Sequence, residues 1–411
     1  MRYNSPMVLL AAACTGPVLV DGAEPAPVDP VERLAGVDDT DTGEDTGSDG
    51  PGTLYDPDHI VQIALTLSDD SVRSLDSDPF GWVPGDLVID GTALPDVGVR
   101  LKGEYNLRDL DGKAAFKIKL DQYVEGQHYD GVPALTLNNY IEDPSFVAER
   151  LVYQAFRAAG LPASRANSAQ LTVNGESFGI YLNLENVGRD FLEGWFTSPD
   201  GNLYEEIGYD FSPGHADDFE QEQGEDHSHA DLSALIAAVD AASPDTFEAD
   251  LAPVLDVPRF LRYCAMEGIV NQWDGYCYTR FGPNNFRVYD DTGTGQFSLL
   301  PAGMDMAMKG LETYWMPLAE PEGLLLQRCF ASVPCYADYL DAIAEMAAVF
   351  DGEDLPGRAD AIYAQIHQAV LDDPRKECTD AEFERTFEDV RQFAEQRTQN
   401  LDVGQGLRPL D

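Results

Sequence analysis

The spacing of apolar residues changes along the chain, and this change is the strongest constraint on the fold. Up to about residue 185 apolar residues mostly alternate with polar ones, which is typical of β-strands that bury one face. Beyond that point they mostly recur at the spacing of a buried helix face. A strand-rich N-terminal part followed by a helix-rich C-terminal part predicts an α+β fold with two lobes and a cleft between them.

The same patterns give the positions of individual elements. The predicted strands cover residues 59–67, 87–102 (a hairpin around Asp90-Gly91), 116–120, 135–137, 168–173, 178–185, 284–289 and 296–300. The predicted helices cover residues 145–159, 230–242, 258–271, 335–350, 357–371 and 380–399. The acidic stretch from residue 205 to 231 is predicted to be a loop.

Charge is segregated along the chain. With 26 basic and 74 acidic residues the formal net charge is −48, so nucleic acid and anionic membrane surfaces are not expected as partners. Residues 190–258 contain eighteen acidic residues and no Lys or Arg. The basic residues that gather in one short region are Arg100, Lys102, Arg108, Lys113, Lys117 and Lys119. This region could attract a polyphosphate, or its lysines could balance nearby carboxylates.

The first residues have the parts of an export signal. Arg2 precedes the apolar run Met7–Leu10, and small residues precede Cys14, so that Leu-Ala-Ala-Ala-Cys resembles a bacterial lipobox. Residues 1–14 are therefore predicted to be a lipoprotein signal peptide, with Cys14 lipidated. The protein would be exported and anchored by lipid in the cell envelope, at the outer membrane or cell surface, with no other membrane contact. A wrongly assigned start codon or a buried hydrophobic N-terminus is the alternative.

Residues 15–54 have a different composition from the rest of the chain. They are rich in Asp, Thr, Gly and Pro and contain too few apolar residues to compensate for the entropy lost on ordering. We predict a disordered acidic tether, with calcium binding by its Asp-x-Asp spacing as the alternative. Residues 55–411 are predicted to form the folded domain.

The cysteines of an exported protein can form disulfides. Cys329 and Cys335 are close enough in the sequence to close a small loop. Among Cys264, Cys277 and Cys378 one further pair can form, and the sequence does not select it.

Three polar residues stand out in the second half of the chain. Asp274, Asn285 and Asp305 lie near apolar segments, where a polar side chain is costly to bury unless it binds something. Phosphoryl transfer needs these residue types, because a carboxylate orients the incoming hydroxyl while a carboxylate and an amide oxygen hold a divalent metal. Asp and Asn also cap helices and close turns, and this alternative stays open.

From about residue 58 to 348 the chain resembles the CotH kinase family, through short motifs that occur in the order of the family. Val97–Gly103 is similar to its Arg-Leu-(Arg/Lys)-Gly strand, and Leu171–Glu185 to its Asn-Gly hairpin. The other matching segments are Phe116–Leu120, Asn202–Glu205, Asn271–Asp274, Asn284–Asp290 and Pro301–Asp305.

The resemblance implies an atypical protein-kinase-like fold of two lobes. It implies an enzyme that uses ATP with Mg²⁺ or Mn²⁺ to phosphorylate hydroxyls of an extracytoplasmic protein. On this basis Asp274 is the catalytic residue, and Asn285 and Asp305 are metal ligands. The candidates for nucleotide binding are Lys102, Lys117, Lys119 and, as the partner of one of these lysines, Glu185.

One departure from the family bears on activity. The family's Pro-Trp-Asp-x-Asp run reads Pro301-Ala302-Gly303-Met304-Asp305, so that its first carboxylate is absent. The alternative function is therefore a non-catalytic binding or structural module at the cell surface, with the same fold.

Overall fold

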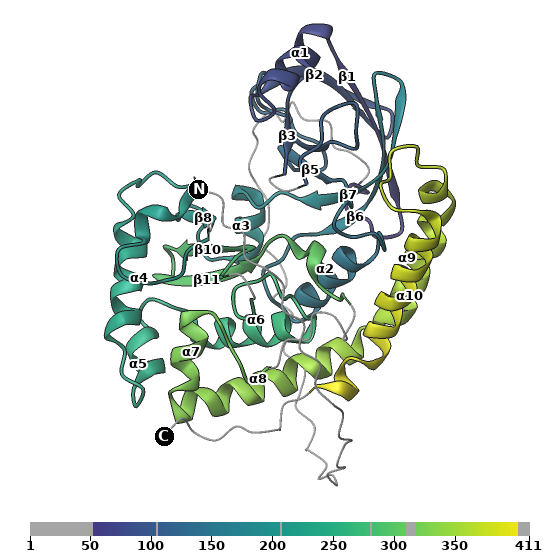
Figure 1. The fold of residues 1–411 in the computed structure, drawn as a ribbon. Helices are drawn as coiled ribbons and strands as arrows, with labels where there is room; N and C mark the ends of the chain where they lie inside the picture. The colour runs from purple at the N-terminus through teal and green to yellow at the C-terminus, as the bar shows by residue number, and fades with distance from the viewer. Residues whose placement is uncertain (1–51, 104–105, 206–207, 280–281, 310–317, 402–411) are drawn as a thin grey trace, which may run out of the picture. The chain divides into compact units, whose positions relative to one another are not determined.

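The computed structural model describes residues 52–103, 106–205, 208–279, 282–309 and 318–401, which all belong to one compact unit, Thr46–Asp411. The segments predicted to be a signal peptide (1–14) and a tether (15–54) lie outside the described residues, apart from residues 52–54. The described part is α+β, with most strands in its N-terminal part and most helices in its C-terminal part, as predicted (Figure 1).

Seven strands form a closed barrel. They are β1 (Ile60–Leu67), β2 (Val83–Ile89), β3 (Thr92–Lys102), β4 (Ala115–Lys119), β5 (Ala134–Asn138), β6 (Ala166–Val173) and β7 (Glu176–Glu185), in the order β1-β2-β3-β4-β5-β7-β6. The parallel pair β1 and β6 closes the ring. Alternation decides which side chains fill the barrel: Val99 and Leu101 point inward, whereas Arg100 and Lys102 point outward.

The two predicted hairpin turns are confirmed. Asp90 and Gly91 join β2 to β3, and Asn174 and Gly175 join β6 to β7, each with φ between 47° and 87°. Positive φ at both central residues matches the twist of the flanking strands, and Asn, Asp and Gly adopt it at the least strain.

A second sheet has four strands in the order β11-β10-β8-β9. They are β8 (Leu203–Glu205), β9 (Glu220–Gln223), β10 (Phe286–Asp291) and β11 (Gln296–Pro301). The prediction of a loop over residues 205–231 is wrong for β9 and for the short 3₁₀-helix Ala216–Asp218. The sequence Glu-Gln-Glu-Gln has no apolar face, so its strand conformation depends on pairing with β8 rather than on burial.

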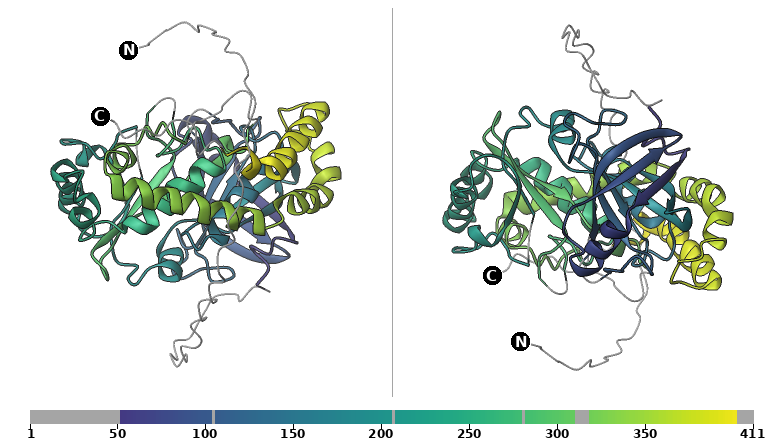
Figure 2. Two further views of the ribbon diagram at one scale, coloured as in Figure 1. Left: turned by 90° about the horizontal axis from the view of Figure 1, so that it is seen from below. Right: turned by 90° about the horizontal axis from the view of Figure 1, so that it is seen from above.

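Helices make up most of the remaining structure. They are α1 (Asp69–Ser77), α2 (Ala148–Ala158), α3 (Arg189–Trp195), α4 (Ala230–Ala241), α5 (Phe247–Leu251), α6 (Val257–Ile269), α7 (Leu324–Phe330), α8 (Val333–Gly352), α9 (Leu355–Leu371) and α10 (Asp380–Gln396). All six predicted helices are present, and α1, α3, α5 and α7 were not predicted. Figures 1 and 2 show α9 and α10 side by side next to the barrel. None of the described helices combines the length and apolar character that a membrane span needs.

Helix α2 begins at Ala148, three residues later than predicted. The Ser145 hydroxyl oxygen accepts hydrogen bonds from the backbone N–H groups of Val147 and Ala148, both at 3.1 Å, and so satisfies donors at the helix start. Phe146 has a φ of 57°, which the helix cannot contain.

The disulfides lie among the C-terminal helices. The predicted Cys329–Cys335 pair is confirmed and links α7 to the start of α8. The second disulfide joins Cys264 in α6 to Cys277, and Cys378 is left as a half-buried thiol.

A buried carboxylate holds the same segment that the Cys264–Cys277 disulfide ties to α6. Glu267 accepts hydrogen bonds from the N–H groups of Tyr276 and Cys277, at 2.9 and 2.6 Å, and from the Tyr263 hydroxyl, at 2.9 Å. Burial raises the pKa of Glu267 to about 7. The loop after α6 is therefore fixed by a covalent bond and by three donors to one side chain.

A buried ion pair joins the barrel to the C-terminal helices. Lys113, just before β4, donates to Asp373, just after α9, and both side chains are at most 1% exposed. Asp373 also accepts from the N–H of Ile180, at 3.1 Å. The backbone of β7 makes room for it at Gly179, where a Cβ atom would lie 1.9 Å from the Asp373 carboxylate carbon.

Replacing Lys113 with Met should leave the Asp373 charge buried without its cation. We expect the free energy of unfolding, measured by urea denaturation, to fall by about 3–5 kcal/mol. Lys119→Met is the matched control, because Lys119 is 47% exposed, and should change it by no more than about 0.5 kcal/mol. Equal losses in the two variants would contradict the role assigned to the buried pair.

Replacing Glu267 with Gln should place an amide NH₂ against a backbone N–H donor. We therefore expect the free energy of unfolding at pH 5 to fall by about 1–3 kcal/mol. Because the folded pKa of about 7 lies above the usual value of 4.5, wild-type stability from this group declines as pH rises between these values. Gln does not titrate, so the difference in unfolding free energy between the wild type and the Gln variant should be smaller at pH 8 than at pH 5. Urea denaturation at both pH values measures this difference, and Glu345→Gln on the surface of α8 is the control. The same difference at pH 5 and pH 8 would contradict the prediction.

Candidate active site

Lys102 ends strand β3 on the outer side of the barrel. Its ammonium donates to the side-chain oxygen of Asn138, at the end of β5. The Asn138 amide nitrogen in turn donates to the Glu149 carboxylate at 3.1 Å. Burial lowers the pKa of Lys102, and the charges of Glu149 and Asp305 oppose this shift.

Glu149 lies in the first turn of α2 and is 1% exposed. Its backbone N–H donates to the Asp143 carboxylate at 3.2 Å, which fixes the start of the helix. Burial raises the pKa of Glu149, the nearby Asp305 carboxylate raises it further, and Lys102 opposes both. The charges of Lys102, Glu149 and Asp305 therefore act on one another.

Asp305 lies in the short 3₁₀-helix Met304–Met306 that follows β11. Burial raises its pKa to about 6, and the positive charges of Lys309 and Lys102 lower it in part. Among the described residues no donor or cation lies within bonding distance of its carboxylate, although the side chain is partly exposed. This carboxylate therefore has spare acceptor capacity.

Asp274 and Asn285 are in direct contact. The Asn285 amide nitrogen donates to the Asp274 carboxylate at 2.7 Å and to its backbone carbonyl at 2.9 Å. The other carboxylate oxygen accepts from Asn284 at 3.2 Å. Burial raises the pKa of Asp274, whereas Lys309, whose charge also acts on Asp305, lowers it. Lys309 thus lies within electrostatic range of both aspartates.

Gly303 lies directly against Asn285. Its φ is +53°, and a Cβ atom there would lie 2.2 Å from the side-chain oxygen of Asn285. The Gly303 carbonyl accepts from the Gln272 side chain at 2.9 Å. Asn285 therefore fills the space into which a side chain at position 303 would project.

Lys117 lies in a second charged network beside Lys102. Arg287 of β10 donates to Glu222 of β9 at 2.6 Å and to Glu205 of β8 at 2.7 Å. The Lys117 ammonium is 3.9 Å from Glu222, and its positive charge acts on Lys102. The acidic segment that was predicted to be a loop supplies these counter-charges.

Two of the predicted nucleotide-binding residues lie apart from this group. Lys119 is exposed at the far end of β4, 3.8 Å from Asp121. The expected pairing of Glu185 with a lysine is wrong, because Glu185 binds the Arg165 guanidinium at 2.6 and 2.9 Å. Strand register is the reason: Asn138 faces Leu182, and Glu185 lies three residues farther along β7, about 10 Å away.

Sequence reasoning missed Glu149, the acidic partner of Lys102. A signal was present, because Glu149, Val152 and Phe156 share one face of the predicted helix. A glutamate among apolar residues on a helix face requires a buried partner. Asn138 and Lys309 carried no comparable signal.

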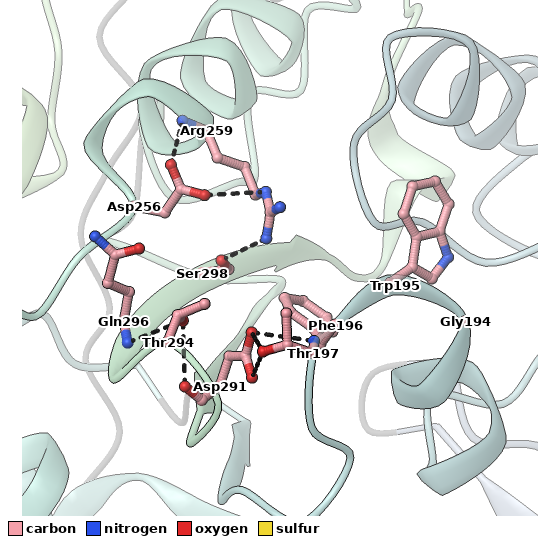
Figure 3. Close-up of a pocket in the computed structure, with 10 residues that line it drawn as sticks. All are labelled: Gly194, Trp195, Phe196, Thr197, Asp256, Arg259, Asp291, Thr294, Gln296 and Ser298. Carbon is pink, nitrogen blue, oxygen red and sulfur yellow. Dashed lines mark hydrogen bonds and ion pairs between the residues drawn. The ribbon is translucent and has the colours of Figure 1, made fainter. Parts of the chain in front are cut away.

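A separate cavity of about 300 Å³ lies at the other end of the β10–β11 hairpin (Figure 3). Arg259 reaches it from α6 and donates to the Ser298 hydroxyl at 3.0 Å. Asp291 accepts from Thr197 at 2.8–2.9 Å within its wall. Its polar groups are engaged with one another, and none of the site residues described above lines it.

Comparison with known proteins places the chain in a family. The family model described as CotH kinase protein matches residues 99–401, more than half of the chain. The inner spore coat protein H of Bacillus subtilis is 22% identical over 345 residues, which cover 79% of this chain and 91% of that protein. Invasin CotH3 of Rhizopus delemar is 26% identical over 203 residues, or 46% of this chain and 32% of the invasin.

A solved structure, that of the Helicobacter pylori proinflammatory kinase CtkA, covers 74% of this chain and 97% of its own, with 10% identity and a TM-score of 0.27. A likeness this remote has no bearing on the fold. The family model matches residues 99–401, and the chain therefore belongs to the CotH kinase protein family.

Proposed function

We propose that the chain is a protein kinase that transfers the γ-phosphoryl group of ATP to protein hydroxyls in the presence of a divalent metal. The observation that carries the proposal is the hydrogen-bonded bridge from Lys102 through Asn138 to Glu149, with Asp305 within electrostatic range of both charges, together with the Asp274–Asn285 contact. Kinases need a lysine held by a helix glutamate, a metal-binding aspartate and a hydroxyl-orienting aspartate; here Asn138 links the lysine to the glutamate.

The proposal includes a two-lobed arrangement. The barrel would form one lobe and contributes Lys102, and α2 contributes Glu149. The second sheet and the C-terminal helices would form the other and contribute Asp274, Asn285 and Asp305. A nucleotide between them would meet cations from one side and acceptors from the other.

In the proposed reaction a Ser, Thr or Tyr hydroxyl oxygen attacks the γ-phosphorus of ATP. The new oxygen–phosphorus bond forms as the bond to the β-phosphate oxygen breaks, and ADP leaves with that electron pair. Asp274 accepts the hydroxyl proton, for which its raised pKa makes it a better base than an exposed aspartate. The Lys102 ammonium, which Asn138 holds in place, would neutralise phosphate oxygens.

Two side chains of the candidate site have oxygen atoms available as ligands for a divalent metal. Asp305 and the side-chain oxygen of Asn285 accept no hydrogen bond among the described residues. The described residues include no group of three acidic, His or Cys side chains that could hold a metal without further ligands. One carboxylate and one amide oxygen suit Mg²⁺ or Mn²⁺ that arrives with the phosphates, whose negative charge the metal would neutralise.

We also propose that the protein is exported and anchored at the cell envelope by a lipid on Cys14. The signal-like residues 1–14 support this, and the two disulfides are compatible with it. A non-catalytic surface module is the second candidate, and Gly303, which leaves the site with one carboxylate fewer, is the observation that favours it.

The test of the kinase proposal compares Asp305 with Asp290. Burial raises the pKa of both to about 6, but Asp290 lies at the other end of β10. ATP with Mg²⁺ or Mn²⁺ should raise the melting temperature of the full chain. Asp305→Asn should remove that shift and lower phosphoryl transfer about 100-fold or more, whereas Asp290→Asn should keep both. No shift and no transfer in the wild type would favour the non-catalytic module.

A second comparison concerns the lysines. Because Lys102 is linked through Asn138 to Glu149 at the candidate site, Lys102→Met should weaken ATP binding roughly tenfold or more. Lys119→Met should leave ATP affinity within about twofold, since an exposed charge is screened. Isothermal titration calorimetry with ATP and Mg²⁺ measures both; equal losses would show that the whole cationic face binds the nucleotide.

A further inference from the structure

The outer face of β3 and β4 carries a row of cations that extends away from the candidate active site. Arg100 faces Lys117 across the two strands, and Lys119 faces Gly98 one step beyond. Their neighbours Val99 and Ile118 fill the barrel. The row therefore begins beside Lys102, at the candidate nucleotide site, and runs along the two strands away from that site to Lys119.

The cations of this row lie farther from carboxylates than several other basic residues of the chain do. The nearest carboxylates are 3.9 Å from Lys117 and 3.8 Å from Lys119, and Arg100 forms no ion pair with any residue that the structure describes. The Nε atom of Arg100 is buried without a hydrogen-bond partner in the described structure. The charge of this row is therefore only loosely compensated from within the chain.

Other arginines of the chain show that close pairing is readily achieved. Arg287 and Arg165 each contact a carboxylate at 2.6 Å, and Arg375 does so at 3.1 Å. Acidic residues outnumber basic ones by 74 to 26, so internal partners are abundant. Cations left loosely paired in such a chain are available to an anion from outside.

Exposed aromatic side chains flank the same row. The Arg100 guanidinium lies 5.3 Å from the centre of the Trp82 ring, and the Tyr123 hydroxyl donates to the Trp82 carbonyl at 3.2 Å. Phe80 and Tyr123 are 49% and 47% exposed. Aromatic rings beside arginine are characteristic of surfaces that bind protein segments.

The backbone holds this surface in place. The N–H of Leu101 donates to the Pro79 carbonyl at 2.8 Å, which fixes the Phe80–Trp82 segment to β3. Gly98 lets Gln122 and Trp82 approach the strand closely, since a Cβ there would lie 2.5 Å from Gln122. The surface is pre-formed, so little ordering would be needed on binding.

We propose that this surface, the β3–β4 patch (Phe80, Trp82, Arg100, Lys119 and Tyr123), docks an acidic, hydroxyl-bearing segment of a protein substrate. Charge complementarity selects an acidic occupant, and the exposed rings supply apolar contact. Arg100 and Lys102 are two residues apart on one strand face, about 7 Å, so a segment docked on the patch could present a neighbouring hydroxyl near Lys102. The phosphorylation of that segment rests on the proposed function, whereas its binding does not.

A suitable probe has the sequence of residues 38–49, Asp-Asp-Thr-Asp-Thr-Gly-Glu-Asp-Thr-Gly-Ser-Asp, with six carboxylates and four hydroxyls. The matched control is the same synthetic peptide with every Asp and Glu replaced by Asn and Gln. Fluorescence anisotropy of each labelled peptide with the full chain measures binding without any turnover.

The acidic peptide should bind at least about tenfold more tightly than the neutral one, and less tightly as salt is raised. Arg100→Gln and Lys119→Gln should each weaken its binding roughly three- to tenfold. Arg189→Gln, an exposed arginine of α3 (57% side-chain exposure), is the control and should bind as the wild type does. Equal binding of the two peptides, or wild-type affinity in both patch variants, would overturn the proposal.

Steady-state kinetics separates this proposal from the kinase proposal. With the acidic peptide as phosphoryl acceptor, Arg100→Gln should raise the KM for peptide and leave the KM for ATP unchanged. A raised KM for ATP alone would assign Arg100 to the nucleotide site and overturn docking. If the wild type transfers phosphate to neither peptide, the kinase proposal loses support while the anisotropy result still decides whether the patch binds.

Discussion

The arrangement of the candidate site depends on the bridge from Lys102 through Asn138 to Glu149. A partly buried ammonium and a buried carboxylate are each unfavourable alone, so the three side chains must be brought together as the chain folds. This requirement sets the position of α2 against strands β3 and β5. Once α2 is placed, Asp305 comes within electrostatic range of Glu149. The barrel and the segment after β11 are thereby coupled through charge.

The loop between β3 and β4 is held from the opposite side. Asn139, the neighbour of Asn138, donates to the carbonyls of Asn106 and Lys113, at 3.4 and 2.8 Å. Lys113 in turn is locked to Asp373 at the end of α9. The segment that follows Lys102 is therefore connected to the C-terminal helices through two short steps.

Periodicity was sufficient to predict the barrel strands and the long helices, because each buries a face with a regular spacing. It failed at β9, whose Glu-Gln-Glu-Gln sequence becomes a strand only by pairing with β8. Motif resemblance located Asp274 and Asn285, which are in contact. It chose the wrong partner for a lysine, since Glu185 and Glu149 can be distinguished only by strand register and helix placement, which are tertiary properties. The sequence could not reveal the effect of Lys309 on the pKa values of Asp274 and Asp305, because that effect depends on how the folded chain places the three charges.

Gly303 limits which residues can occupy its position. Aspartate tolerates the left-handed backbone better than most residues, so the conformation alone does not bar it. The barrier is steric, because Asn285 already fills the volume beside Gly303 while it also holds Asp274. Any side chain at position 303 would therefore require Asn285 to move, and with it the contact that holds Asp274.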